Sequence, residues 1–288
     1  MKYLPESLRK EYERISNELP DLEGFEPPYI NISDSLRAYF ILAHYFTDES
    51  SEVQEEMLVG VRDYTLLGSA IGRQKTEFGG KKKYTKPIDI CATLLYGLVK
   101  NHSFSDGNKR TALLILLYQL SLYGYIPNEK QKKFEELVVA IASDSIPTTY
   151  KNLYGKTKKA DDRIVATISR VIRRYVKKKD HSYHVAPTMK DVCDSLEKLG
   201  VNCDRVGNKM HFTYIEKSGW FKKEKKKGYA VSFSGWTRIV GADTLRKVLQ
   251  KLGLYEQYAN YKDFLKGEDP MYQLVNEFET PLRRLKDK

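Results

Sequence analysis

The feature that most constrains the fold is residues 111–125, a segment that is apolar on nearly every face. A helix that is apolar all round must lie inside a protein core or a membrane. This segment is too short for a membrane span and is interrupted by Gln119 and Gly124, so it predicts a buried central helix. A second helix is predicted over Pro87–Lys100, because proline is favoured in the first turn of a helix. The chain is therefore expected to be mainly α.

The connector between these two helices, residues 101–110, is unusually polar for a link between core elements. Buried polar groups cost free energy unless they have partners, so this loop predicts a ligand site. Gly107 and Asn108 lie where the second helix begins, and helix N-termini attract anions, phosphate first among them. Arg110 offers a planar fork for phosphate oxygens and Lys109 a point charge.

Two further side chains of the loop are suited to bind a metal ion and to accept a proton. Asp106 is suited to Mg²⁺, because a metal that bridges phosphates needs only one or two carboxylates from the protein. His102 is the group of the loop that can accept a proton near neutral pH. A base, a metal ligand and a phosphate cradle so close together predict nucleotide-dependent transfer to a hydroxyl.

The loop resembles the Fic motif, in the form His102-x-Phe104-x-Asp106-Gly107-Asn108-Lys109-Arg110. The continuation Lys109-Arg110-Thr111-Ala112 is similar to the Doc (death-on-curing) branch of that family. The similarity extends over residues 34–150 and implies an all-helical catalytic domain.

The resemblance also implies a role for each motif position. In Fic proteins the histidine deprotonates a Ser, Thr or Tyr hydroxyl of a target protein, and the acidic residue holds Mg²⁺ against the phosphates of ATP. These roles fall on His102 and Asp106. The backbone of Gly107 and Asn108 corresponds to the anion hole, and Arg110 to the arginine that contacts phosphate.

One departure leaves the transferred group open. Adenylylating Fic enzymes usually have a second arginine three residues after the first, and this chain has Leu113 there. Its absence resembles the Doc pattern, which implies phosphorylation of a translation factor by a toxin-like kinase, whereas Gly107 resembles the adenylylating enzymes. We find no internal Ser/Thr-x-x-x-Glu-Gly/Asn inhibitory pattern, so a separate antitoxin partner is plausible.

A Gly-rich basic stretch precedes the motif, namely Gly79-Gly80-Lys81-Lys82-Lys83. Two interpretations have equal weight. The composition is that of a flexible, solvated loop, whereas the resemblance implies a flap that docks an extended target segment by strand addition.

The charge is uneven along the chain: residues 1–150 carry a net charge of −3 and residues 151–288 a net charge of +14. This asymmetry favours an RNA or ribosome contact through the C-terminal half. A nucleic-acid-binding protein that acts mainly through its C-terminal module is the alternative function. Three cysteines without a CxxC pair suggest neither disulfides nor zinc, and we expect a soluble, cytoplasmic protein with no membrane contact.

Five regions are predicted: an N-terminal appendage (1–29), the Fic/Doc-like domain (30–155), a connecting basic helix (156–184), an α+β module (185–255) and a peripheral helical tail (256–288). In the module, the order helix, strand, strand, helix (residues 188–199, 209–217, 228–240 and 243–252) resembles double-stranded-RNA-binding folds and, more weakly, HicA-type modules. His211 is displaced from the place of the HicA histidine, which favours a binding module over a nuclease.

Overall fold

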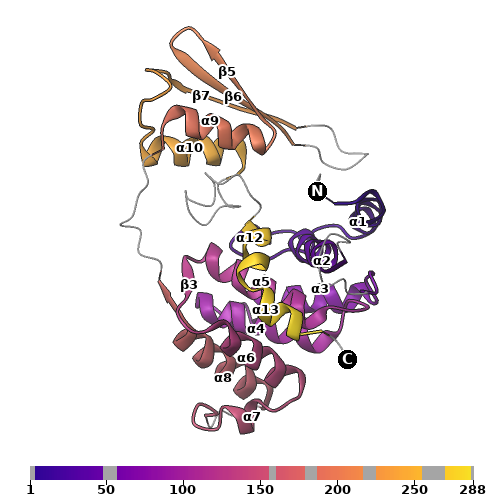
Figure 1. The fold of residues 1–288 in the computed structure, drawn as a ribbon. Helices are drawn as coiled ribbons and strands as arrows, with labels where there is room; N and C mark the ends of the chain where they lie inside the picture. Colours follow the sequence, from indigo (N-terminus) through magenta and orange to yellow (C-terminus); the bar gives the residue numbers. More distant parts are fainter. Residues whose placement is uncertain are drawn as a thin grey trace. The chain divides into compact units, whose positions relative to one another are not determined.

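The computed structural model describes residues 4–47, 57–155, 160–178, 187–216, 225–254 and 270–286. The chain divides into two compact units, of which unit 1 comprises residues 1–179 and 271–288 and unit 2 comprises residues 180–270. Unit 1 is helical with two very short sheets, and unit 2 combines helices with a three-stranded sheet (Figure 1). The predicted mainly α fold with a smaller α+β module is confirmed.

The centre of unit 1 is a pair of helices, α4 (Pro87–Asn101) and α5 (Asn108–Leu122). Residues 113–118 of α5 are at most 2% exposed, which confirms the predicted buried helix. Helix α4, α2 (Ile32–Thr47) and α6 (Gln131–Ala142) pack around α5. The connector between α4 and α5 is thus held from both ends by the core.

The rest of unit 1 surrounds this pair. Its other elements are α1 (Glu6–Glu18), α3 (Tyr64–Gly72), the 3-10 helix η1 (Arg73–Lys75), α7 (Ile146–Thr149), α8 (Ala160–Tyr175), α12 (Pro270–Glu277), α13 (Glu279–Arg284), the antiparallel strands β1 (Glu77–Phe78) and β2 (Lys81–Lys82), and the antiparallel strands β3 (Tyr125–Pro127) and β4 (Val176–Lys178).

The structure joins segments that the sequence suggested as separate regions. Helix α1 contributes the fully buried Ile15, and α8 packs along α4 as part of the same core. The C-terminal segment is helical, as predicted, but its peripheral placement is wrong. Its apolar side chains Met271, Val275 and Leu282 are completely buried in unit 1. Residues 255–269 of the predicted tail lie outside the described residues.

Unit 2 is built on the antiparallel sheet β5 (Val201–Val206), β6 (Lys209–Glu216) and β7 (Lys225–Ser232). Helices α9 (Met189–Lys198) and α10 (Ala242–Leu252) cover one face of this sheet (Figure 1). The module therefore contains three strands where we predicted two. Strand β5 escaped prediction because four of its six residues are exposed, which weakens its alternating pattern.

His211 lies on the face of this sheet that the helices leave uncovered. It sits between Met210 and Phe212, which are buried, and side chains alternate between the two faces of a strand. Its cross-strand neighbours are Asp204 and Ala230. The turn of the basic hairpin, residues 217–224, lies outside the described residues, and the HicA-like resemblance remains a prediction.

Among the residues described, no helix combines the length and the hydropathy that crossing a bilayer requires.

Gly97 marks the closest approach between α4 and its neighbours. A Cβ atom there would lie 2.6 Å from Cδ of Arg73 and 3.1 Å from Cα of Ala70. The Arg73 side chain is held in place by a bond from Nε to the Thr93 carbonyl oxygen (3.3 Å). Any side chain at Gly97 would therefore push α3 and η1 away from α4.

We expect Gly97→Ala to lower the free energy of unfolding by about 1 kcal/mol, because overpacking outweighs the gain in helix propensity. The control is Gly68→Ala in α3, where a Cβ meets nothing within 4 Å, and it should stabilise the protein by up to about 1 kcal/mol. Urea denaturation of the two variants measures both values. Equal stability of the two variants would show that the α3–α4 contact is loose.

Candidate active site

The motif loop begins with a strained residue. His102 is the C-cap of α4 and has a left-handed backbone, with φ 49° and ψ 48°. Residues other than glycine rarely adopt this conformation, and such strain concentrates at functional sites. The side chain of His102 is exposed. Helix α4 therefore ends by presenting an imidazole to solvent.

The loop is fixed from outside by the segment that precedes α3. Val61 and Phe104 form an antiparallel bridge. The Arg62 N–H donates to the Ser103 carbonyl oxygen (2.8 Å), and the Ser105 N–H donates to the carbonyl oxygen of Gly60 (2.9 Å). This backbone pairing holds the loop in one conformation.

Asn108 fixes the loop from inside. Its Oδ1 accepts a hydrogen bond from the Phe104 N–H (2.9 Å), and its Nδ2 donates to the Phe104 carbonyl oxygen (2.8 Å). Both residues are buried, so these two bonds satisfy backbone groups that would otherwise be costly. The side-chain amide of Asn108 therefore serves the loop and not a ligand.

Phe104 anchors the loop in the core. Its ring stacks on Tyr39 of α2, with the ring centroids 4.2 Å apart and an interplanar angle of 14°. The Tyr39 hydroxyl accepts a bond from the Gly60 N–H (2.9 Å). Burial raises the pKa of Tyr39 to about 12, so this phenol stays neutral and acts as a support. The sequence analysis did not identify Tyr39, because it lies 63 residues before the motif histidine.

The start of α5 suits an anion and a metal ion. Gly107 is the N-cap, with φ 74°, and no side chain caps the helix there. L side chains rarely adopt this positive φ, so the position favours glycine, and a Cβ there would also lie 2.6 Å from Cε of Met57, which would have to shift. Asp106 is half-buried, and its Oδ1 accepts the Gly107 N–H (2.5 Å). Since Mg²⁺ bound to phosphates needs few protein carboxylates, this single aspartate fits the expected role.

Within the described residues, no group of three or more His, Cys, Asp or Glu side chains could hold a metal ion. The expected role of Asp106 needs no such group, because a metal that bridges phosphates takes only one or two carboxylates from the protein.

We correct the prediction that Arg110 contacts phosphate. Arg110 is 1% exposed, and its Nε donates to the Leu282 carbonyl oxygen (2.8 Å). Its Nη2 donates to the Arg283 carbonyl oxygen (3.2 Å), and its guanidinium lies 4.4 Å from the ring centroid of Phe46. Arg110 thus holds the C-terminal segment on the core.

Lys109, predicted to meet phosphate, also contacts the C-terminal segment. It is half-buried, and its Nζ donates to the Lys286 carbonyl oxygen across 3.4 Å. Among the polar side chains expected to act in the motif, His102 is exposed and Asp106 is half-buried, just before the start of α5. No sequence signal pointed to residues 270–286 as a neighbour of the motif.

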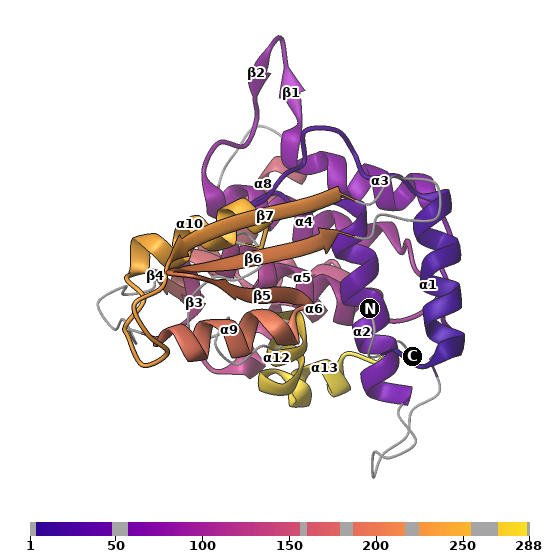
Figure 2. The ribbon, with the colours of Figure 1, turned by 90° about the horizontal axis from the view of Figure 1, so that it is seen from above.

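The Gly-rich stretch forms a hairpin that projects from the helical body (Figure 2). Strands β1 and β2 pair through Gly79 and Gly80, which have φ 57° and 73°, as two-residue turns of this kind require. Lys83 is tied to Asp162 of α8 (2.5 Å), which raises the pKa of its ammonium. Lys81 and Lys82 are exposed, and Phe78 is 78% exposed. The stretch is therefore a hairpin and not a structureless loop, and its docking role stays a prediction.

Comparison with known proteins gives two matches. Residues 29–120 match the Fic/DOC family. A relative named "Toxin Doc", from Mycolicibacterium smegmatis, is 46% identical over 52 residues. That match covers 18% of this chain, and the chain spans 40% of the relative's length. A search of solved structures gives no significant match. The resemblance of the motif to this family is confirmed.

The left-handed backbone at His102 leads us to predict how substitutions there change stability. Glycine adopts this conformation freely, whereas alanine keeps the strain. We expect His102→Gly to be about 1 kcal/mol more stable than His102→Ala in urea denaturation. If His102→Ala were the more stable of the two, the loop would have no strain at this position.

A second stability prediction concerns the buried guanidinium of Arg110. We expect Arg110→Ala to lower the free energy of unfolding by about 3 kcal/mol, because two carbonyl oxygens lose a charged donor. Amide hydrogen exchange in residues 271–286 should rise in that variant. Lys109→Ala, one residue away, is the control and should change stability by less than about 1 kcal/mol. Equal effects of the two substitutions would contradict the anchoring role of Arg110.

Proposed function

We propose, from the premise that residues 29–120 form a Fic/DOC-family domain, that unit 1 transfers a phosphate-containing group from ATP to a hydroxyl side chain of a target protein. One observation carries the proposal. An exposed histidine, His102, shares a rigid loop with Asp106 and with the N-terminus of α5, whose N-cap is Gly107. This is the set of groups that such a transfer needs: a base, a metal ligand and an anion site.

Each residue has a defined task in this proposal. His102 takes the proton of the target hydroxyl, which makes the oxygen a better nucleophile. Asp106 holds Mg²⁺, which when bound neutralises charge on the phosphates. The start of α5 at Gly107 and Asn108 stabilises a phosphate group through the positive end of the helix. Phe104, Tyr39 and the Asn108 amide keep the loop in place.

We further propose that the group transferred is the γ-phosphoryl group. Two positions support this choice over adenylyl transfer. Leu113 occupies the place of the second family arginine and is completely buried. Arg110 is turned to the C-terminal segment. Neither position supplies a cation for the outer phosphates in the adenylylating orientation, so we favour the reversed nucleotide of the Doc pattern.

The β1–β2 hairpin is the proposed docking site of the target. An extended target segment would add a strand along the hairpin, and Phe78 would supply an apolar contact. The exposed Lys81 and Lys82 favour a target segment that carries acidic side chains.

The name of the relative, "Toxin Doc", motivates a toxin-like role for this chain as well. We propose a target in the translation machinery and a separate antitoxin as inhibitor, both in the cytoplasm. The lack of an internal inhibitory pattern in the sequence supports inhibition by a partner.

The test is to incubate the purified protein and cell extract with Mg²⁺ and with ATP labelled at either the α or the γ phosphate. We expect a target protein to acquire γ label only. His102→Ala should reduce the labelling rate by about a hundredfold or more, because general base catalysis is lost.

The matched control is His211→Ala, which removes a half-exposed histidine of unit 2 and should leave labelling unchanged. Label from the α phosphate alone would replace the kinase proposal by adenylylation. Labelling that persists at the wild-type rate in His102→Ala would refute the catalytic role of the motif.

A further inference from the structure

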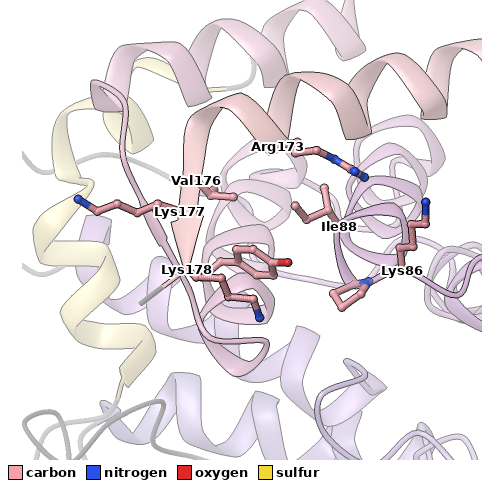
Figure 3. Close-up of a pocket in the computed structure, with 8 residues that line it drawn as sticks. Lys86, Ile88, Arg173, Val176, Lys177 and Lys178 are labelled. Carbon is pink, nitrogen blue, oxygen red and sulfur yellow. The ribbon is translucent and has the colours of Figure 1, made fainter. Parts of the chain in front are cut away.

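A basic pocket lies on unit 1, away from the motif loop. It has a volume of about 280 Å³. Its floor is apolar and aromatic, and its rim is basic (Figure 3). The lining residues are Lys86, Pro87, Ile88, Tyr125, Arg173, Val176, Lys177 and Lys178.

The pocket is distinct from the candidate active site. Lys86 and Pro87 stand at the first turn of α4, and His102 stands at its last. A 15-residue helix at about 1.5 Å per residue separates the two by about 20 Å. No residue of the motif loop lines the pocket.

Much of the positive charge of the C-terminal half belongs to unit 1. Residues 151–179 carry 11 Lys and Arg and 2 Asp, a net charge of +9, whereas residues 180–270 carry a net charge of +4. Three of these basic residues, Arg173, Lys177 and Lys178, line the pocket.

The charges of the rim are incompletely neutralised. Arg173 has Asp89 within 3.5 Å, and Asp89 also accepts a bond from Ser169. Lys178 donates to the Tyr123 carbonyl oxygen (3.0 Å) and lies 4.2 Å from the ring centroid of Tyr125. Lys86 and Lys177 are exposed and form no ion pair with any residue in the described ranges. Such a rim attracts anions.

The directions of the basic side chains select the kind of anion. In Figure 3 the ends of Lys86 and Lys177 point away from each other on opposite sides of the pocket, and Lys178 points to a third side. A single phosphate cannot meet charges that diverge in this way, whereas successive phosphates of a strand can. The half-exposed Tyr125 also lines the pocket and, with Ile88 and Val176, forms an apolar surface that suits an unpaired base.

We propose that this pocket binds single-stranded nucleic acid, with one base against Tyr125 and the neighbouring phosphates on Lys86, Arg173 and Lys177. A duplex does not fit, because its bases are stacked and paired and none can enter the pocket. The site is independent of the phosphate-transfer proposal, since it uses no residue of that machinery.

The test measures the binding of a fluorescent single-stranded oligouridylate to the full chain carrying His102→Ala, without ATP, by fluorescence anisotropy. The informative variant is Lys86→Glu/Lys177→Glu. A glutamate at the start of α4 complements the helix dipole, so Lys86→Glu should not impair folding. We expect at least about tenfold weaker binding at low salt, and a salt-dependence slope smaller by about 1.4 for the two lost phosphate contacts.

The matched control is Lys247→Glu/Lys251→Glu, which makes the same change of charge on two exposed lysines of α10 in unit 2. It should leave the affinity within about twofold of wild type. Equal weakening by both double variants, or an effect of the control variant alone, would overturn the proposal. So would a wild-type protein that does not bind the oligonucleotide.

Two competitors and one more variant separate the remaining alternatives. Tyr125→Leu should weaken binding about tenfold if a base stacks there; an unchanged affinity would refute the base contact. Uridine monophosphate that competes as well as the oligonucleotide would establish a mononucleotide site instead of a strand site. Polyglutamate that competes equally well would show an acidic protein to be the partner.

Discussion

The burial of one positive charge shapes how unit 1 is assembled. The guanidinium of Arg110 is inside the core, where an ion without partners would be very costly. Its acceptors are the carbonyl oxygens of Leu282 and Arg283, which follow 172 and 173 residues later. The start of α5 is therefore completed only when the C-terminal segment returns to it. Unit 2 (residues 180–270) is thus inserted between β4 and α12, which both belong to unit 1. The two parts of unit 1 that flank this insertion must come together for unit 1 to form.

The same constraint explains why some motif residues support the core whereas others are left for a ligand. Arg110 and the amide of Asn108 serve the core, one by holding α13 and the other by closing the loop on Phe104. The strain at His102 is balanced by these contacts, because the loop cannot relax while both of its ends and its middle are pinned. What faces solvent is then the imidazole of His102, with the carboxylate of Asp106 half-buried and the start of α5 buried. Their chemistry depends on supports that touch no ligand.

Local patterns in the sequence were enough for the helices and the loop. The apolar run predicted α5 and Pro87 marked the start of α4, so the motif was expected in the connector between them, where it lies. Contacts between distant parts of the chain were not predictable. The side chain of Arg110 has the same chemistry whether it meets a phosphate or two carbonyl oxygens, and only the return of residues 270–286 decides between them. Strand β5 was missed for a related reason, since most of its side chains are exposed and its pairing with β6 is what defines it.

The charge of the C-terminal half predicted a polyanionic partner but not the surface that would meet it. A net charge says how strongly a surface attracts a polyanion, and its position along the chain does not say which fold it joins. Arg173, Lys177 and Lys178 lie C-terminal to the motif in sequence, yet they line a pocket together with Lys86 and Pro87 at the start of α4. Because α4 ends at His102, a strand bound at its first turn would be held about 20 Å from the candidate base. A rigid helix thus sets a fixed spacing between the proposed nucleic-acid contact and the proposed transfer chemistry. That spacing suits a protein target that is itself bound to RNA.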